Sequence, residues 1–160
     1  MNLRDKIMEE TLVLPIKANN QPDAIQELLQ HLQNTQILTA TTKLFSLINN
    51  NEKISPCAAG RGIAYPHSTS MEIETLACVL GFSKIGIDFN SPDGQLCHII
   101  LLTLSPIEFP LEHRKFITRF RIMIENPLIR SKLFDVTKPL DVINIIENWE
   151  DDDSKTDELN

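Results

Sequence analysis

The sequence predicts an α/β fold, a three-layer sandwich in which one β-sheet lies between two layers of helices. Segments with apolar residues at helical spacing are interspersed with short apolar runs. The run 97–104 is the most hydrophobic in the chain, and it lacks the apolar–polar alternation of a strand with one face in water. It therefore indicates a central strand that helices cover on both faces.

The elements before residue 60 are one strand and two helices. The segment 11–16 indicates an edge strand interrupted by Pro15, because proline cannot donate to a sheet ladder. Apolar residues recur at helical spacing after Pro22, which a first helical turn tolerates, and again over 39–50. The later elements, in chain order, are a buried strand at 76–82, an extended segment at 86–89, a turn at 91–94, and helices at 110–125, 128–134 and 139–149.

Length and charge favour one domain with an acidic extension. The chain has 160 residues, 42% of them hydrophobic, which is enough for one core. The net charge is -7, and residues 150–160 contribute six acids and one lysine, or five of those negative charges. We therefore expect a domain at 1–149 and a disordered acidic tail at 150–160. No basic stripe with interleaved aromatic residues is present, so a nucleic-acid partner is not expected.

Compartment and cofactor use follow from what the sequence lacks. No apolar run is long enough to span a bilayer, and the first residues lack the apolar core of a signal peptide. Cys57, Cys78 and Cys97 are widely spaced and form no C-x-x-C pair, so neither a disulfide framework nor a zinc site is indicated. We expect a cytoplasmic protein without direct membrane insertion, metal or cofactor.

The segment 60–68, with the sequence GRGIAYPHS, is the most informative in the chain. Gly60 and Gly62 allow a tight turn, because glycine takes positive φ without steric cost. Pro66 is expected to end the short apolar strand that follows and to project His67 out of the sheet. A histidine held there suits nucleophilic or proton-transfer chemistry, although a histidine that merely caps a turn gives the same local pattern.

The other histidines have simpler interpretations. His31 lies on the polar side of its helix, which indicates solvated surface. His98 lies in the central strand, which indicates a core or edge histidine with satisfied hydrogen bonds. His113 comes early in its helix on the same stripe as core residues, where a role in the core and a role at an anion site are both open. No motif of a serine hydrolase, P-loop, dinucleotide fingerprint or zinc protease occurs.

The run Gly60-x-Gly62-Ile63-Ala64-x-Pro66-His67 resembles the active-site motif of one family. This family is the fructose/mannitol-type enzyme IIA of the bacterial phosphotransferase system, which includes the stand-alone nitrogen-regulatory enzyme IIA proteins. The resemblance covers about residues 3–149 and implies the family's mixed central sheet. Further matches are Gly86-Ile87-Asp88-Phe89, Asp93-Gly94, and the central strand followed by Ser105-Pro106 and then His113.

The resemblance assigns roles to the two histidines. It implies that His67 accepts a phosphoryl group from HPr or an HPr-like carrier, and that His113 contacts this group without carrying it. Transfer between two imidazoles is nearly thermoneutral, so positioning and hydrogen bonds suffice without a metal. The phosphate-binding residues expected around them are Gly60, Arg61, Gly62 and Ser68.

The motif departs from the family pattern at several positions. Asn51 stands where an arginine is usual, although Glu52 matches the glutamate that follows it, and 55–57 replaces a Ser/Thr-rich approach. Arg61 stands between the glycines, where a small polar residue is common, and we hypothesise that it restores the missing charge. Tyr65 occupies a position that is usually aliphatic.

The function expected from the resemblance is that of a regulatory phosphohistidine carrier acting on a target protein. A regulatory role is favoured because the chain shows no membrane segment and no fused transporter domain. One alternative is a sugar-specific enzyme IIA that passes the phosphoryl group to a cysteine of a separate enzyme IIB. Another is a degenerate binding module that has lost phosphotransfer, and a further one is a metal site formed by His67, His113 and Cys57.

Overall fold

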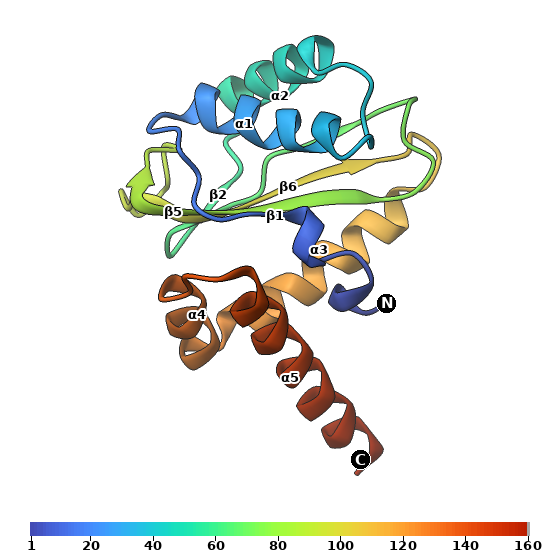
Figure 1. Cartoon of the computed structure of the whole chain (residues 1–160), viewed down its shortest axis with the longest axis vertical. Coiled ribbons are helices and arrows are strands. Elements are labelled where there is room, and N and C mark those ends of the chain that lie inside the picture. Colours follow the sequence, from blue (N-terminus) through green and yellow to red (C-terminus); the bar gives the residue numbers. More distant parts are fainter. Residues whose placement is uncertain (160) are drawn as a thin grey trace.

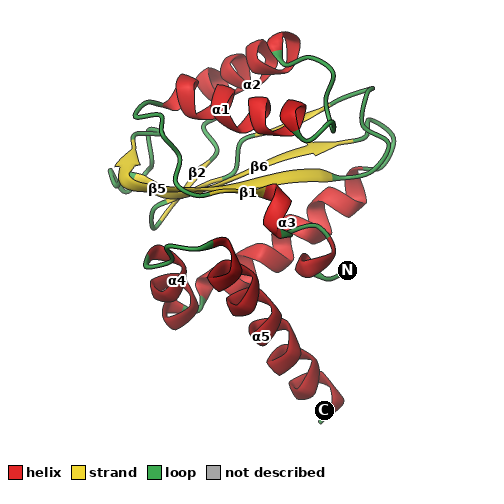
Figure 2. Ribbon diagram, viewed as in Figure 1, coloured by secondary structure: helices red, strands yellow, loops and turns green. Residues whose placement is uncertain are grey.

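The computed structural model describes residues 1–159 and confirms the α/β sandwich, with a mixed sheet between two helical layers (Figures 1 and 2). The strands are β1 (Leu12–Val13), β2 (Ala58–Gly60), β3 (Ile63–Ala64), β4 (His67–Thr69), β5 (Ala77–Ile87) and β6 (Cys97–Ser105). Their spatial order is β1-β5-β6-β3-β2, and β4 also pairs with β6. β5 and β6 are antiparallel, whereas β3 and β4 pair with β6 in parallel.

The helices divide between the two faces of the sheet. They are α1 (Gln21–Asn34), α2 (Thr42–Ile54), α3 (Pro110–Glu125), α4 (Pro127–Phe134) and α5 (Pro139–Glu158), with 3₁₀ turns at Leu3–Asp5 and Glu9–Thr11. Figure 2 shows α1 and α2 above the sheet, and α3, α4 and α5 below it. The start of α1 is set by Asn20, whose side-chain oxygen accepts from the Asp23 amide at 3.0 Å, and by Pro22 in the first turn.

Two hydrophobic cores, one on each face, explain why β6 lacks alternation. Ile99 and Leu101 belong to the core beneath the sheet, with Phe116 of α3. Ile100 and Leu102 belong to the core above it, with the apolar face of α1. Successive side chains of a strand point to opposite faces, so a strand covered on both sides needs apolar residues at every position. The prediction of a central strand at 97–104 is confirmed.

The strand that follows the glycine motif, β3, ends at Ala64, but the chain pairs with the sheet again directly after Pro66. β3 pairs Ile63 with Ile99, and β4 resumes the same parallel pairing with His67 opposite Thr103. The predicted strand end near Pro66 is confirmed, but the prediction that His67 projects out of the sheet is wrong, because His67 is the first residue of β4. Proline lacks an N–H, but its carbonyl still accepts from the Thr103 amide at 3.0 Å, so the ladder bridges the interruption. As a result, His67 lies on the sheet beside β6 and does not lie in a free loop.

Two other boundaries differ from the sequence prediction. β5 extends from Ala77 to Ile87 and includes the start of the expected extended segment at 86–89. Its pairing with β6 is irregular between Phe82 and Ile87, and the pairing resumes at Ile87 opposite Cys97. α2 continues to Ile54, beyond the end that was predicted at residue 50.

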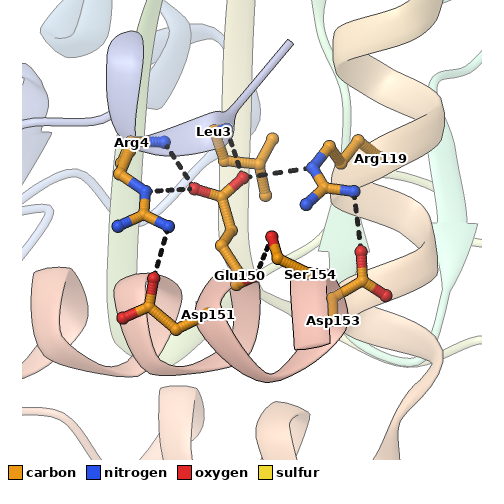
Figure 3. Close-up of polar contacts among 7 residues, drawn as sticks. All are labelled: Leu3, Arg4, Arg119, Glu150, Asp151, Asp153 and Ser154. Atoms are coloured by element: carbon orange, nitrogen blue, oxygen red, sulfur yellow. Dashed lines mark hydrogen bonds and ion pairs between the residues drawn. The ribbon is translucent and has the colours of Figure 1, made fainter. Parts of the chain in front are cut away.

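The acidic segment is helical, which corrects the prediction of a disordered tail. α5 runs without a break from Pro139 to Glu158, so the expected boundary at residue 150 falls inside a helix. Glu150 is completely buried, and its carboxylate accepts bonds from the Leu3 amide and from the side chains of Arg4 and Arg119 (Figure 3). A local reading of charge missed this order because all three partners lie far away in the sequence.

Candidate active site

His67 is fixed by a hydrogen bond that determines which ring nitrogen is free. Its side chain is exposed, and Nδ1 lies 3.1 Å from the carbonyl oxygen of Tyr65. A carbonyl oxygen can only accept, so Nδ1 carries the proton in this arrangement. Nε2 therefore keeps its lone pair and is the nucleophilic atom of the ring.

His113 lies beside His67, as the sequence analysis expected. It is the fourth residue of α3, and its ring centroid is 5.5 Å from that of His67, with the two planes tilted by 35°. Its Nε2 is 2.8 Å from the hydroxyl of Thr103, the buried β6 residue that pairs with His67. Burial, and secondarily the charge of His67, lowers the pKa of His113 below its usual value.

Both histidines line a cavity of about 510 Å³ whose wall carries positive charge. The loop that follows α2 and the start of β2 line one part of this cavity, and the face of α3 that bears His113 lines another. Arg114 and Arg121 line it from α3, and none of the described lining residues is an aspartate or glutamate. The guanidinium carbon of Arg121 lies 4.8 Å from the ring centroid of Tyr65, within cation–π distance.

The expected phosphate-binding glycines form the predicted tight turn, but this turn is not part of the cavity. Gly60 and Gly62 have φ values of +86° and +80°, with Arg61 between them at +58°. The turn is fastened to the opposite loop, because the Arg61 amide donates to Asp93 Oδ2 at 2.8 Å. This bond is the main cause of the lowered pKa of Asp93.

Neither Arg61 nor Ser68 reaches the two histidines. Arg61 lines a neighbouring cavity of about 290 Å³, whose wall also includes Arg121. Ser68 is buried, and its hydroxyl donates to the carbonyl of Thr69 at 3.1 Å. Side chains alternate across a strand, so Ser68 faces away from the side that His67 occupies. The hypothesis that Arg61 supplies the charge at His67 gains no support from this placement.

The loop before β2 brings Cys57 into the cavity wall. The Cys57 amide donates to Glu52 Oε2 at 3.3 Å, and this carboxylate also accepts from Gln21 of α1 at 2.9 Å. Burial, together with the adjacent Glu52 carboxylate, raises the pKa of the Cys57 thiol. The thiol is therefore protonated at neutral pH and is a poor nucleophile. Asn51, by contrast, does not line the cavity.

The sequence analysis missed Thr103, Arg114 and Arg121. Residues 113, 114, 117, 118 and 121 of α3 all line the cavity, and their spacing is that of one helix face. This spacing was visible in the sequence once His113 was chosen. Nothing local showed that the same face would meet Tyr65.

The remaining histidines contact backbone carbonyls. His98 is half-buried, and its Nδ1 is 2.8 Å from the carbonyl oxygen of Ser83, which agrees with a histidine whose hydrogen bonding is satisfied. His31 is half-buried, and its Nε2 lies 2.6 Å from the carbonyl of Glu10, so it is less solvated than expected. Residues 1–159 place no group of three or more histidine, cysteine, aspartate or glutamate side chains where they could bind a metal ion together.

The length and the apolar content of the helices decide whether any of them could span a membrane. None of the helices formed by residues 1–159 combines the length and the apolar content needed to cross a membrane. The longest is α5, and its second half is strongly acidic.

Comparison with known proteins decides the family. The family described as "Phosphoenolpyruvate-dependent sugar phosphotransferase system, EIIA 2" matches residues 6–149, which is nearly the whole chain. The chain belongs to the EIIA 2 family. This confirms the resemblance found in the glycine–histidine motif and the turn that follows it.

Two relatives and one solved structure are similar to this EIIA 2 protein over most of its length. It is 27% identical over 135 residues to a nitrogen regulatory protein of Bradyrhizobium diazoefficiens, which covers 83% of this chain and 86% of that protein. It is 25% identical over 146 residues to the fructose-specific EIIABC component of Bacillus subtilis, of which the chain spans 23%. The structure of IIA-Ntr from Neisseria meningitidis superposes with a TM-score of 0.82 at 19% identity, over 90% of this chain and 98% of the other, which shows the shared fold.

Proposed function

We propose that this EIIA 2 protein carries a phosphoryl group on Nε2 of His67, accepted from the phosphohistidine of HPr or an HPr-like carrier. One observation carries the proposal. The centroids of the two imidazoles lie 5.5 Å apart at a cavity whose lining, within residues 1–159, includes two arginines and no carboxylate. A phosphoryl group brings up to two negative charges, which suits a wall without carboxylates.

The hydrogen bond to Tyr65 supports transfer to Nε2. The lone pair of His67 Nε2 attacks phosphorus, the bond between phosphorus and the donor imidazole breaks, and its electron pair stays on that imidazole. The Nδ1 proton remains on the His67 ring and continues to donate to the Tyr65 carbonyl. No proton has to leave the acceptor during the step, so no general base is required.

His113 stabilises the phosphoryl group once it is bound to His67. Its lowered pKa keeps it neutral at pH 7 before transfer. When the Thr103 hydroxyl donates to Nε2 of His113, the proton of His113 lies on Nδ1, where it is available to a phosphoryl oxygen. The negative charge of the phosphoryl group then raises the pKa of His113, and a protonated ring strengthens the contact.

Exposed apolar side chains that shortly precede His113 in the sequence support a protein as the donor. Ile107, Phe109 and Leu111 lie two to six residues before His113, and each is more than half exposed. Clustered exposed apolar residues are typical of protein–protein contact surfaces. A carrier protein that docks here brings its own phosphohistidine toward the mouth of the cavity.

The downstream role that we propose is regulation of a target protein. The similarity to a nitrogen regulatory protein extends over most of both chains, which supports this role. Phosphorylation adds charge to one surface patch and so changes which partners bind there. A second candidate, passage of the phosphoryl group to an enzyme IIB during sugar uptake, draws support from the similarity to a fructose-specific EIIABC component.

We place the carrier in the cytoplasm. Its three cysteines are free, and two of them are buried, a pattern that suits a reducing compartment. The phosphoenolpyruvate-dependent system to which the family belongs supplies the donor there.

The test is intact-mass spectrometry after incubation with phosphoenolpyruvate, enzyme I and an HPr-type carrier. We expect a gain of one phosphoryl group that is lost in acid and absent in His67→Ala. Ser68→Ala is the matched control, because it removes the neighbouring hydroxyl and leaves His67 in place. A wild-type protein that gains no mass with active upstream partners would refute the proposal and leave a binding module without phosphotransfer.

A further inference from the structure

The geometry points to Arg121 as the cation that contacts the phosphoryl group on His67, with the ring of Tyr65 holding its guanidinium in place. This inference rests on the proposed function, and it adds a residue that the motif does not include. Arg121 lies two turns along α3 from His113 and lines the same cavity. Its assignment depends on three features of the cavity wall.

The first feature is that Tyr65 holds both groups. Its carbonyl oxygen fixes His67 by accepting from Nδ1 at 3.1 Å. Its ring lies under the Arg121 guanidinium at 4.8 Å. One buried residue therefore sets the position of the nucleophile through its backbone and that of the cation through its side chain. The ring also packs edge-on against Phe120 at 6.0 Å, which limits its movement.

The second feature is that the charge of Arg121 is not neutralised within the wall. Among residues 1–159, no carboxylate oxygen lies within 4.0 Å of its guanidinium. Glu125 lines the neighbouring cavity together with Arg121, but it does not line the cavity of His67. Arg119 on the same helix is different, because it is paired with both Glu150 and Asp153. Burial raises the pKa of Tyr65 to about 12, so the ring beneath Arg121 is neutral. Arg121 is thus available to an anion.

The third feature is that the other cations are less well placed. Arg61 faces the neighbouring cavity and lines no part of the wall around His67. Arg114 lines the right cavity and is exposed like Arg121, but no aromatic ring or carboxylate within the described chain holds its guanidinium. A fixed guanidinium loses less side-chain entropy when it binds, and its planar fork can donate two N–H bonds to phosphoryl oxygens.

Chemical loading tests the inference without any protein donor. Phosphoramidate phosphorylates the imidazole directly, because the Nε2–phosphorus bond forms as the phosphorus–nitrogen bond of the reagent breaks and ammonia leaves. The phosphorus NMR signal of the loaded protein is assigned to His67 by its absence in His67→Gln. The pKa of the phosphoryl group is then read from the pH dependence of this signal.

We expect the phosphoryl pKa to rise by about one unit in Arg121→Gln, because an adjacent cation favours the dianion. Tyr65→Leu keeps the carbonyl that fixes His67 and frees the guanidinium, so a smaller rise is expected. Lys115→Gln is the matched control, since it removes an exposed charge from the same helix outside the cavity wall. It should leave the phosphoryl pKa unchanged.

The outcomes separate this inference from the proposed function. A phosphoryl pKa in Arg121→Gln equal to that of the wild type would overturn the role of Arg121. A wild type that phosphoramidate cannot load at His67 would overturn it as well, because the cavity would then hold no phosphoryl group. Loading by phosphoramidate together with no transfer from the HPr-type carrier would refute the proposed function, while the pKa comparison would still decide the role of Arg121.

Discussion

The substitution Glu150→Gln tests how far one buried carboxylate stabilises the packing of α5 on the rest of the fold. Oε1 of Glu150 accepts from the Leu3 amide at 2.6 Å and from Arg119 Nε at 3.1 Å. Oε2 accepts from the amide and Nε of Arg4 at 3.2 and 3.1 Å. Glutamine keeps the shape of the side chain but has one acceptor oxygen. Its NH₂ group then faces N–H donors on the other side, and the negative charge is lost.

The magnitude follows from the burial of this carboxylate. Removing one partner of a buried ion pair costs about 3–5 kcal/mol. The side chains of Arg4 and Arg119 are 33% and 23% exposed, and they keep Asp151 and Asp153 as partners. Water and these carboxylates offset part of the loss, so we expect the lower end, about 3 kcal/mol. For a chain of this size that corresponds to a fall in Tm of about 6–12 °C.

Thermal unfolding followed by far-UV circular dichroism measures this effect. Asp151→Asn is the control, because it also removes one negative charge that is paired with Arg4, but from a side chain that is 56% exposed. Its midpoint should stay close to that of the wild type. If Glu150→Gln melts no lower than Asp151→Asn, the buried carboxylate does not hold α5 in place and the reasoning is refuted.

Two further predictions concern the site and the core. Because the pKa of His113 is lowered in the folded protein, the unfolded chain binds more protons than the folded chain as the pH falls through about 6.5. The wild type should therefore lose stability relative to His113→Gln as the pH falls. Urea-unfolding free energies that stay parallel for the two proteins across this pH range would contradict the prediction. In Gly81→Ala the new Cβ would lie 2.5 Å from Cδ1 of Ile16 and 2.9 Å from Cδ2 of Leu28, inside a filled core. We expect about 1–3 kcal/mol of destabilisation, seen as a lower urea midpoint, and an unchanged midpoint would show that the neighbours move aside.

The sequence was sufficient for the layers of the fold because periodicity reports burial directly. The continuous apolar run of β6 indicates a strand that is buried on both faces, and the helical spacing of apolar residues in α1 and α3 indicates which helix face packs on the sheet. It was insufficient where long-range partners override a local preference. Pro66 continues a parallel pairing because its carbonyl meets the Thr103 amide. Glu150 is ordered because its partners come from the N-terminus and α3.

The candidate site was predictable only as far as its motif extends. The motif identified His67, and the chain-long resemblance identified His113, which lies beside it. The same reasoning assigned the glycine turn to the proposed phosphate site, because residues close to His67 in the sequence were assumed to be close to it in space. The turn instead belongs to the hairpin of β2 and β3, where the Arg61 amide is fastened to Asp93.

Two departures from the family pattern, Asn51 and Tyr65, are better explained together than one at a time. Asn51 removes a charge from the position where an arginine is usual, and taken alone this loss suggests decay of the site. Tyr65 replaces an aliphatic side chain with a ring, and that ring lies under Arg121 at the cavity that contains His67. In a decayed site, nothing would maintain a guanidinium that is held by a ring, forms no ion pair within residues 1–159 and lines the same cavity as the histidine. The pairing of Tyr65 with Arg121 therefore favours relocation of the cation over loss of phosphotransfer.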